Sequence, residues 1–211
     1  MATDRDNDRA KPIVLITGAA GNIGTSLAGR LADGYRIVGL DRPKTKADFP
    51  LIHADLSKDE SVENAIAEFR DKFGDRIASV VHLAAYFDFS GEENPLYQSI
   101  NVEGTRRLLK ALQPLDVEQF VYSGTMLVHA PGEPGQRIDE DQPIEPGWAY
   151  PISKAKAEEV IRAGHGDIPY VLLHLAGLYD DETAVPTLTN QIARIYQRDF
   201  QSHFYAASAQ V

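Results

Sequence analysis

Short apolar segments alternate with longer amphipathic segments along most of the chain. The apolar runs predict strands at Ile13–Thr17, Arg36–Leu40, Leu51–His53, Ser79–Leu83, Gln119–Ser123 and Tyr170–Leu175. Apolar positions at helical spacing predict helices at Ile23–Ala32, Ser57–Lys72, Pro95–Leu112, Tyr150–Arg162 and Pro186–Arg198. Strands that alternate with helices need crossover connections, and near-continuous apolar strands are covered on both faces. We therefore predict an α/β fold, a doubly wound parallel sheet with helices on both faces.

Charge and cysteine content narrow the class of function. The 211-residue chain suits one domain, or one domain and a fragment of a second, and its net charge of −10 disfavours nucleic acid as a partner. Apolar runs stay well short of the roughly 18–20 residues of a membrane span. The sequence has no cysteine, and its six histidines show no H-x-x-x-H pair, so we expect no metal site. We expect a cytoplasmic protein that acts on a small molecule, without a membrane or nucleic-acid partner.

A glycine-rich turn follows the first predicted strand and opens the first predicted helix. Gly18-Ala-Ala-Gly21-Asn22-Ile23-Gly24 has the spacing G-x-x-G-x-x-G in the strand–turn–helix context that a dinucleotide site requires. Gly18 permits the tight turn, Gly21 lets backbone N–H groups approach a pyrophosphate, and Gly24 allows close helix–strand packing. The helix N-terminus at Asn22 and Ile23 faces the anion. These residues predict a Rossmann-type cofactor loop.

Residues after the second and third predicted strands bear on the choice of cofactor. A carboxylate at Asp41 accepts hydrogen bonds from the adenosine ribose hydroxyls and repels a 2′-phosphate, which favours NAD. Arg42 has the charge to pair with a 2′-phosphate, so NADP remains the second choice. Asp55, followed by Leu56, has two interpretations of equal weight. It contacts the adenine amino group, or it caps the next helix.

A tyrosine and a lysine lie one helical turn apart in a predicted helix. The segment Tyr150-Pro-Ile-Ser-Lys154 places both side chains on one helix face. An ammonium favours a phenolate, so we expect Lys154 to lower the pKa of Tyr150 from its usual ~10. A tyrosine tuned in this way takes the proton of an alcohol while a hydride leaves the same carbon. Together with the glycine loop, the pair predicts a nicotinamide-dependent enzyme.

Five motifs in order resemble the extended short-chain dehydrogenase/reductase family, which contains NAD-dependent epimerases, dehydratases and reductases. The resemblance extends from Lys11 to about Tyr179. The motifs are the glycine loop that begins at Thr17, Asp55-Leu56, Val81-His82-Leu83-Ala84-Ala85, Asn101-Val-Glu-Gly-Thr105, and Phe120-Val-Tyr-Ser123-Gly-Thr125 followed by Tyr150-x-x-x-Lys154. The resemblance implies that Leu83, Ala84 and Ala85 line the cofactor. It also implies that Asn101 lies near the cofactor and braces the fourth strand.

The resemblance also implies a catalytic set. Tyr150 would be the general acid/base, Lys154 would lower its pKa and hold the nicotinamide ribose, and Thr125 would hydrogen-bond the reacting oxygen. Ser123 is expected at a strand end near the cofactor. The structural alternatives are a buried tyrosine, a solvated lysine and a helix-capping threonine. The implied reaction is hydride transfer on a secondary alcohol or ketone, in a nucleotide sugar or a hydroxysteroid-like substrate.

Several positions depart from the family pattern or leave alternatives open. His129 stands where relatives often carry tyrosine, and it is either a packed loop histidine, which we favour, or a second proton-transfer group. His174 replaces a usual arginine, so a phosphate anchor is missing, and Met126-Leu127 replaces the acidic pair of dehydratases. The long loop Ala130–Pro146 either faces the substrate or has no such role. A set of aromatic side chains either lines an apolar substrate site or covers the sheet edge: Tyr86, Phe87 and Phe89.

The chain is shorter than family members, which shapes the expected organisation. We expect a flexible tail over residues 1–11, an NAD-binding Rossmann domain with the catalytic Tyr/Lys pair over 12–180, and the start of an incomplete substrate-binding region over 181–211. The helices predicted at Pro95–Leu112 and Tyr150–Arg162 correspond to dimer helices of relatives, so a homodimer is expected by analogy. The competing hypothesis is a catalytically silent NAD(P)-binding sensor or scaffold.

Overall fold

Six parallel strands form the central sheet of the computed structural model, which describes residues 10–88, 91–132, 137–178 and 186–197. The strand order is β3-β2-β1-β5-β7-β8. The strands are β1 (Ile13–Thr17), β2 (Arg36–Asp41), β3 (Leu51–His53), β5 (Ser79–His82), β7 (Phe120–Thr125) and β8 (Tyr170–Leu175). The chain leaves the central strand β1 toward β3, then returns and continues toward β8. The direction of winding therefore reverses between β1 and β5, the point where open α/β sheets bind ligands.

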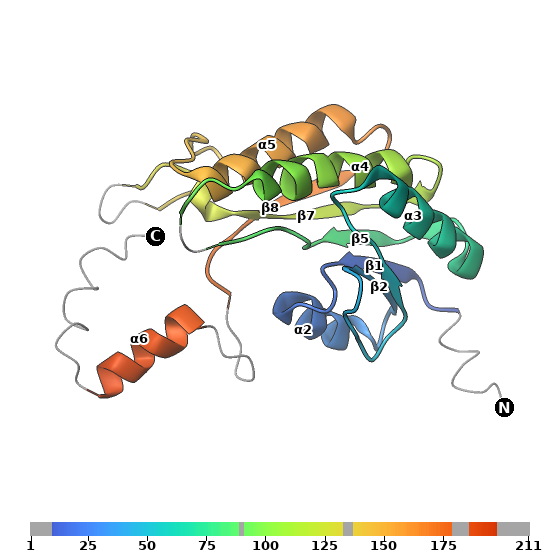
Figure 1. The fold of residues 1–211 in the computed structure, drawn as a ribbon, viewed down its shortest axis with the longest axis horizontal. Coiled ribbons are helices and arrows are strands. Elements are labelled where there is room, and N and C mark those ends of the chain that lie inside the picture. The colour runs from blue at the N-terminus through green and yellow to red at the C-terminus, as the bar shows by residue number, and fades with distance from the viewer. Residues whose placement is uncertain (1–9, 89–90, 133–136, 179–185, 198–211) are drawn as a thin grey trace.

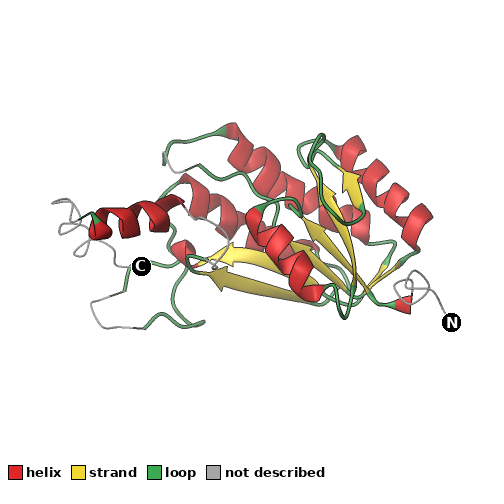
Figure 2. Ribbon diagram, turned by 90° about the horizontal axis from the view of Figure 1, so that it is seen from below, coloured by secondary structure: helices red, strands yellow, loops and turns green. Residues whose placement is uncertain are grey.

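Helices cover the sheet from two sides, as predicted. α3 (Asp59–Phe73), α4 (Glu103–Leu112) and α5 (Ala149–Gly164) lie on one face, and α2 (Asn22–Leu31) lies on the other (Figures 1 and 2). A further helix, α6 (Pro186–Tyr196), follows β8 in the chain. The predicted doubly wound parallel sheet is confirmed, and the predicted strands agree with the observed ones to within two residues at each end.

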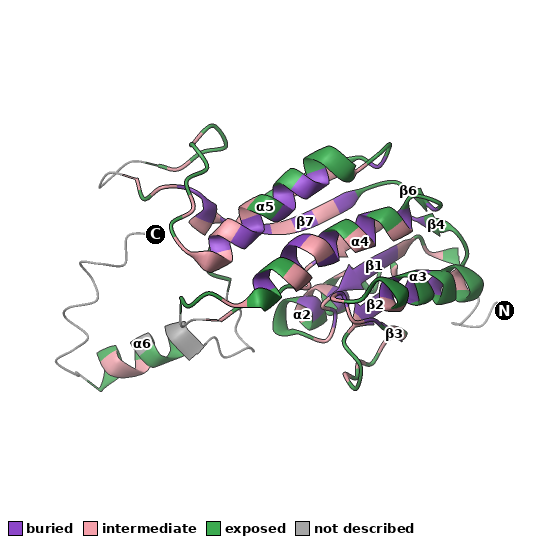
Figure 3. Ribbon diagram, turned by 45° about the horizontal axis from the view of Figure 1, so that its top comes forward, coloured by how far each residue is buried: buried purple, intermediate pink, exposed green. Residues whose placement is uncertain are grey.

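The core is divided by the sheet into two unequal parts. The larger cluster lies between the sheet and the α3–α4–α5 layer and includes Leu15, Phe69, Leu108 and Phe120. The smaller cluster lies under α2. Buried positions follow the sheet-facing sides of α3, α4 and α5, while their outer sides are exposed (Figure 3). This distribution explains why the apolar periodicity of these segments predicts helices correctly.

Three features differ from the predicted elements. The single helix predicted at Pro95–Leu112 is a π-helix, η1 (Tyr97–Val102), that continues into α4. A short 3₁₀-helix, η2 (Met126–Val128), follows β7. A separate two-stranded parallel sheet pairs β4 (Arg76–Ile77) with β6 (Asp116–Val117). Elements of two or three residues leave too few positions for a periodic pattern, and a π turn differs from an α turn by one residue.

Part of the apolar surface is exposed on the α2 side of the sheet. Val171 and Leu173 on the edge strand β8 are 37% and 40% exposed. Ile192 and Ile195 on α6 are also exposed.

None of the helices among the described residues has the length and apolar character to cross a membrane. The expected tail over residues 1–11 lies largely outside the described residues, as do the stretch 179–185 and residues 198–211 of the expected substrate-binding region.

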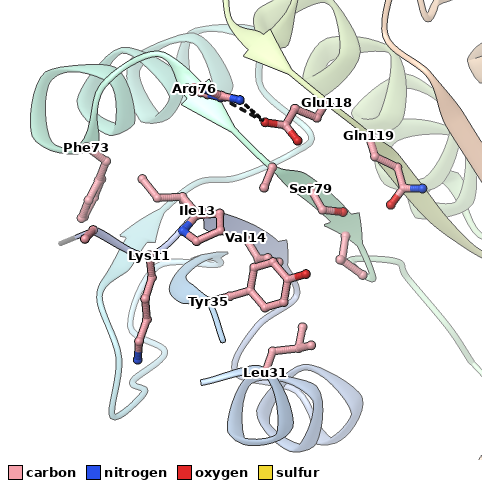
Figure 4. A pocket seen from close by; sticks show the side chains of 14 residues that line it. Lys11, Ile13, Val14, Leu31, Tyr35, Phe73, Arg76, Ser79, Glu118 and Gln119 are labelled. Atoms are coloured by element: carbon pink, nitrogen blue, oxygen red, sulfur yellow. Dashed lines mark hydrogen bonds and ion pairs between the residues drawn. The ribbon is translucent and has the colours of Figure 1, made fainter. Parts of the chain in front are cut away.

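A hollow separate from the expected cofactor site lies at the amino ends of β1 and β5. It has a volume of about 820 Å³ and is bordered by Lys11, Tyr35 and Ser79 (Figure 4). Arg76 and Glu118 form an ion pair at its edge, with Nη2 and Oε1 2.9 Å apart. Ligands of open α/β sheets bind at the carboxyl ends of the strands. Despite its size, this hollow is therefore at the wrong edge for the expected chemistry.

Substitutions at two glycines of α2 test how closely this helix packs against the turn that follows β1. A Cβ atom at Gly24 would lie 2.5 Å from the carbonyl oxygen of Gly18 and 2.7 Å from Ala19 Cα, whereas a Cβ atom at Gly29 meets nothing within 4 Å. We expect Gly24→Ala to lower the free energy of unfolding by about 1–3 kcal/mol through overpacking. Gly29→Ala, the matched control, should raise it by about 0.5–1 kcal/mol. Urea unfolding of both variants measures the difference, and equal effects would contradict the close approach.

Candidate active site

A cleft of about 460 Å³ lies at the carboxyl ends of β1, β2, β3 and β5. It brings together predicted cofactor residues from the glycine loop, from the ends of β2 and β3 and from the segment after β5, whereas the lining does not include Asn22, Ile23, Gly24, Asn101, Ser123, Tyr150 and Lys154. Its lining is Gly18, Ala20, Gly21, Leu40, Asp41, Arg42, Thr45, Ala54, Asp55, Leu56, Leu83, Ala84, Ala85, Tyr86, Phe87 and Ile100. The cleft occupies the point where the winding of the sheet reverses, so its position agrees with the general rule for ligand sites in such sheets.

The glycine loop forms the floor of this cleft at the start of α2. Gly18 has a φ of 68°, a left-handed conformation that favours glycine, and its N–H donates to Leu40 O at 2.9 Å. A side chain at Gly18 would also meet the backbone N of Ala84 at 2.9 Å. The first turn of α2 begins after Gly21, and Asn22 and Ile23 are exposed there. The start of α2 therefore lies beside Gly21 at the cleft, the position in which a helix N-terminus favours an anion.

Asp41 lies opposite the glycine loop with its carboxylate fixed in position. Oδ2 accepts a hydrogen bond from Ala20 N–H at 2.8 Å, and Oδ1 accepts one from Arg42 N–H at 2.7 Å. Each carboxylate oxygen has a second lone pair that remains able to accept from a ligand hydroxyl. The Arg42 side chain also lines the cleft and is exposed.

Asp55 lines the cleft and also organises the turn before α3. Its Oδ1 accepts from Ser57 Oγ at 2.6 Å and from Ser57 N–H at 3.0 Å. The hydrogen bond from the Ser57 hydroxyl lowers the pKa of the Asp55 carboxyl, and a salt bridge with Lys58 acts in the same direction. These contacts fix the turn at Ser57 but do not cap α3, whose start at Lys58 has no side-chain cap, and the position of Asp55 in the cleft leaves the adenine interpretation open.

A buried hydrogen-bonded chain connects β1, β5 and α4 behind the cleft. Thr17 Oγ1 accepts from Ala84 N–H at 3.1 Å and lies 2.6 Å from His82 Nδ1. On the other side of the ring, His82 Nε2 lies 3.0 Å from Thr105 Oγ1, which donates to Asn101 O at 2.6 Å. Because each hydroxyl has one proton, these contacts assign the neutral Nε2–H tautomer to His82. Burial lowers the pKa of His82 to about 3, and the nearby Lys154 charge acts in the same direction.

Asn101 joins the segment after β5 to α5. Its Oδ1 accepts from Tyr86 N–H at 2.7 Å, and its Nδ2 donates to Tyr86 O at 3.0 Å. The same Nδ2 donates to Ser153 Oγ at 2.8 Å, and Ser153 Oγ donates to Tyr150 O at 2.7 Å. Asn101 is 1% exposed. It therefore braces the strand that lines the cleft, the position that the resemblance implies for it.

Tyr150 lies at the start of α5 among aromatic rings. Its ring centroid is 4.6 Å from that of Phe87, which lines the cleft, and 5.7 Å from that of Trp148. Burial raises the pKa of Tyr150 to about 12, and the neighbouring Tyr97 acts in the same direction. The expected lowering of this pKa by Lys154 is wrong for this structure. Tyr86 and Phe87 line the cleft of the predicted cofactor residues, which leaves the choice between a substrate site and a cover of the sheet edge open, and Phe89 lies outside the described residues.

Lys154 points into the core. Its side chain is 1% exposed, and its Nζ lies 4.2 Å from the ring centroid of Tyr122. Burial lowers the pKa of Lys154 to about 7, although Glu158 acts in the opposite direction. The alternative of a solvated lysine is therefore wrong. The ammonium stabilises the Tyr122 ring contact, which explains why it does not shift the Tyr150 pKa as expected.

Thr125 and Ser123 lie at the carboxyl end of β7. Thr125 is 7% exposed, and its Oγ1 accepts from Leu127 N–H at 3.3 Å at the start of η2. This is the capping contact named as an alternative, and the hydroxyl proton is still available to a ligand oxygen. Ser123 Oγ donates to His82 O at 2.9 Å, in agreement with its expected place at a strand end.

Sequence reasoning missed several residues that shape this site. Ser153, Trp148 and Tyr97 contact Tyr150 or its backbone. Glu158 is 1% exposed and lies one turn beyond Lys154 on α5. A spacing of four residues separates Tyr150, Lys154 and Glu158, so the sequence alone could have predicted that they share one helix face. None of the described residues forms a cluster of three or more His, Asp or Glu side chains that would hold a metal ion.

A family model matches most of the chain. The model described as the NAD dependent epimerase/dehydratase family covers residues 14–199. The chain belongs to this family. The family resemblance inferred from the five motifs is therefore confirmed.

Among the similar proteins are enzymes with different substrates. UDP-glucose 4-epimerase of Mycolicibacterium smegmatis is 32% identical over 160 residues, which are 68% of this chain and 48% of the relative. Sterol-4-alpha-carboxylate 3-dehydrogenase of Schizosaccharomyces pombe is 32% identical over 143 residues, which are 65% of this chain and 40% of the relative. The chain thus spans about half the length of these relatives or less.

The solved structure of Thermus thermophilus UDP-glucose 4-epimerase in complex with NAD supports the same assignment. It matches with a TM-score of 0.69 and 27% identity, over 88% of this chain and 63% of that chain.

His82, the buried histidine of the hydrogen-bonded residues behind the cleft, should make the stability of the protein depend on pH. His82 stays neutral when folded down to about pH 3, whereas an unfolded histidine takes up a proton near pH 6.5. The unfolded state thus binds more protons between these values, and stability falls as pH falls below 6.5. This one group should lower the free energy of unfolding by about 2 kcal/mol between pH 7 and pH 5.

Thermal unfolding at pH 7 and pH 5 measures this dependence. The variant His82→Leu should be less stable at pH 7, because two threonine hydroxyls lose a partner, but should lose less stability on acidification. The exposed His53 is the matched control, and His53→Leu should keep the pH dependence of the original chain. An unchanged dependence in His82→Leu would refute the neutral buried histidine.

Proposed function

We propose that this chain binds NAD in the cleft and supports Tyr150-assisted hydride transfer on a secondary alcohol or ketone. The proposal rests on the position of three features at the same edge of the sheet. There the glycine loop, the fixed carboxylate of Asp41 and the Phe87–Tyr150 ring pair meet within one connected site. Membership of an NAD-dependent family and the NAD complex of a similar epimerase support the choice of cofactor.

The residues of the cleft fit a dinucleotide. The start of α2 after Gly21 offers N–H groups to the pyrophosphate, and Asp41 offers lone pairs to ribose hydroxyls. When bound, NAD supplies the hydride acceptor or donor. Leu83, Ala84 and Ala85 form an uncharged wall beside the glycine loop. A carboxylate at Asp41 repels a 2′-phosphate, so we propose NAD in preference to NADP, although Arg42 is also present in the cleft.

Tyr150 is the proposed acid/base. With a pKa of about 12 its phenol is protonated at neutral pH, which suits donation of a proton to a carbonyl oxygen. The reverse reaction needs the phenolate, and Lys154, one turn along α5, is the cation nearest in sequence to stabilise it. For that role the ammonium must leave the Tyr122 ring. Thr125, buried at the end of β7, is proposed to donate its hydroxyl proton to the same substrate oxygen.

The substrate is proposed by class only. The two relatives described above act on a nucleotide sugar or on a sterol carboxylate, according to their names. Phe87, 41% exposed beside Tyr150, and Trp148 provide an aromatic rim on which either an apolar ring or a sugar face packs. We propose a secondary alcohol of one of these two classes.

A catalytically silent NAD-binding protein is the second candidate. The inward position of Lys154 and the raised pKa of Tyr150 favour it, because neither activates the tyrosine as a base.

We further propose the division into a cofactor-binding part over 12–180 and the start of a substrate-binding part over 181–211. A homodimer through α4 and α5 is proposed by analogy, and light scattering that gives only a 23.2 kDa species would rule it out.

Thermal unfolding with and without dinucleotide tests the cofactor. NAD⁺ at ~100 times its Kd should stabilise the folded chain by about 2.7 kcal/mol, or roughly 5–10 °C. Asp41→Ala should weaken NAD⁺ binding and reduce the preference over NADP⁺, because the ribose acceptor and the repulsive charge are both removed. Asp48→Ala, an exposed carboxylate outside the cleft, is the control. A larger shift with NADP⁺ than with NAD⁺ would overturn the proposed cofactor.

The variant Tyr150→Phe separates the enzyme from the silent binding protein. Turnover is followed as NADH formation or as epimer interconversion with UDP-glucose, UDP-galactose and a 3β-hydroxysteroid. Removal of the acid/base should reduce turnover about 10²–10⁴-fold while NAD⁺ binding is preserved. Tyr35→Phe, at the opposite edge of the sheet, should leave both unchanged. Full turnover in Tyr150→Phe would sink the mechanism, and no turnover in the original chain would favour the silent protein.

A further inference from the structure

Three side chains form a hydrogen-bonded chain behind the proposed active site. Glu158 Oε1 lies 3.0 Å from His174 Nε2, and His174 Nδ1 lies 2.8 Å from His129 Nε2. His129 Nδ1 in turn lies 3.2 Å from the carbonyl oxygen of Pro143. The Glu158 side chain is 1% exposed, His129 is 6% exposed and the His174 side chain is 22% exposed. The chain connects α5, β8, the segment after β7 and the loop before α5.

The strand β7 leaves space for this chain at one glycine. A Cβ atom at Gly124 would lie 2.9 Å from Glu158 Oε1 and 3.1 Å from His174 Cδ2. It would also lie 2.8 Å from the carbonyl oxygen of Leu173. Glycine is therefore required here for the carboxylate and the imidazole to meet across β7.

The hydrogen bonds fix the number of protons in the chain. A carbonyl oxygen only accepts, so His129 Nδ1 must carry a proton toward Pro143. One proton must lie between the two rings, and one must lie between His174 Nε2 and the Glu158 carboxylate. The chain therefore holds three protons. Two neutral imidazoles and an ionised carboxylate have only two, so the complete chain holds one additional proton and has no net charge.

The charged neighbours of the carboxylate are consistent with this count. On α5, Arg162 Nη1 lies 3.4 Å from Glu158 Oε2, and the Lys154 charge interacts with Glu158 from one turn away. On β7, the buried Tyr122 hydroxyl has no hydrogen-bond partner among the described residues, and its pKa is raised mainly by burial and further by the Glu158 charge. Glu158 thus accepts from Arg162 as well as from His174, and Lys154 interacts with the same carboxylate.

The two ends of this hydrogen-bonded chain lie on the elements that carry the proposed catalytic groups. His129 directly follows η2, whose first turn is capped by Thr125, and it pairs with Ile144 in an isolated antiparallel bridge. Glu158 lies two turns after Tyr150 on α5. The chain thus ties the Thr125 end of β7 to the Tyr150 helix and to the loop that leads into it.

We propose that His174 is a positioning residue of this active site, which acts through Glu158 on Lys154 and Tyr150 and through His129 on Thr125. The proposal rests on the proposed function, because it assigns His174 a task in that reaction. Its working form is the chain with one additional proton shared by the two imidazoles. Loss of that proton breaks one of the three hydrogen bonds and loosens the loop and η2 from α5.

The variant His129→Gln tests the proton count without a substrate. The two N–H groups of the glutamine amide donate to Pro143 O and to a neutral His174 Nδ1, so the variant needs no additional proton. In the original chain the same three hydrogen bonds need the additional proton, which His129→Gln makes unnecessary.

Nitrogen-15 spectra of the histidine rings give a direct readout in the same variants. At pH 7 the original chain should show one doubly protonated imidazole shared between His129 and His174, and His129→Gln should show a neutral Nε2–H tautomer at His174. His165→Gln, at the end of α5, is the control and should change neither signal. Two neutral rings at pH 7 would show that the imidazoles do not hold the additional proton, and would overturn the proposed working form.

Turnover tests the positioning role. His174→Phe should lower turnover by about 10–100-fold, as displaced catalytic groups do, while the Kd for NAD⁺ stays within about twofold because the chain lies outside the cleft. His165→Gln, which lies outside this hydrogen-bonded chain, should leave the turnover unchanged. Normal turnover in His174→Phe would overturn the positioning role. If the original chain has no turnover, the proposed function fails, and the spectra still decide the proton count.

Discussion

The requirement that buried polar groups find partners organises the centre of this molecule. Thr17, His82 and Thr105 have almost no exposed surface, and each finds its hydrogen-bond partner in another of the three or in nearby backbone. An unpaired hydroxyl or imidazole at this depth costs about 1–3 kcal/mol, so the arrangement tolerates few alternatives. Because the neutral histidine donates on one side and accepts on the other, the hydrogen bonds through these three side chains run in a single direction. β1, β5 and α4 are therefore fixed relative to one another by proton positions as well as by apolar packing.

This constraint reaches both halves of the site. At one end, Thr17 accepts from Ala84, which forms the wall of the cleft beside the glycine loop. At the other end, Thr105 donates to Asn101, and Asn101 contacts Ser153, whose hydroxyl binds the Tyr150 carbonyl. The segment proposed to face the cofactor and the helix of the proposed acid/base thus belong to one hydrogen-bonded path.

The fold could be predicted from the sequence because its signals are local. Apolar runs such as Ile13–Thr17 and Tyr170–Leu175 match the observed strands, and the turn at Gly18 has a backbone conformation that favours glycine. The site was predictable in part. Asp41 and the glycines meet in the cleft, since the carboxyl ends of parallel strands share one edge. The direction of the Lys154 side chain was not predictable, because it depends on burial against Tyr122, far away in the sequence.

The other features that could not be predicted from the sequence also depend on contacts between distant segments of the chain. The pairing of His174 with Glu158 requires β7 to lack a side chain between them, which only the three-dimensional position of Gly124 reveals. The π turn at Tyr97–Val102 depends on tertiary contacts of Asn101 rather than on helix propensity. Sequence patterns report which face of an element is buried. They do not report which polar atoms meet across that buried face.

The edge position of β8 has a consequence for how this chain behaves in solution. Its outer backbone groups have no strand partner among the described residues, and Val171 and Leu173 add apolar surface beside them. An unpaired apolar edge is a template for strand addition by another molecule, and like-charge repulsion is a common defence against it. The net charge of −10 supplies that repulsion at low ionic strength, and added salt screens it. Solubility of this chain is therefore a matter of ionic conditions, with self-association favoured as salt rises.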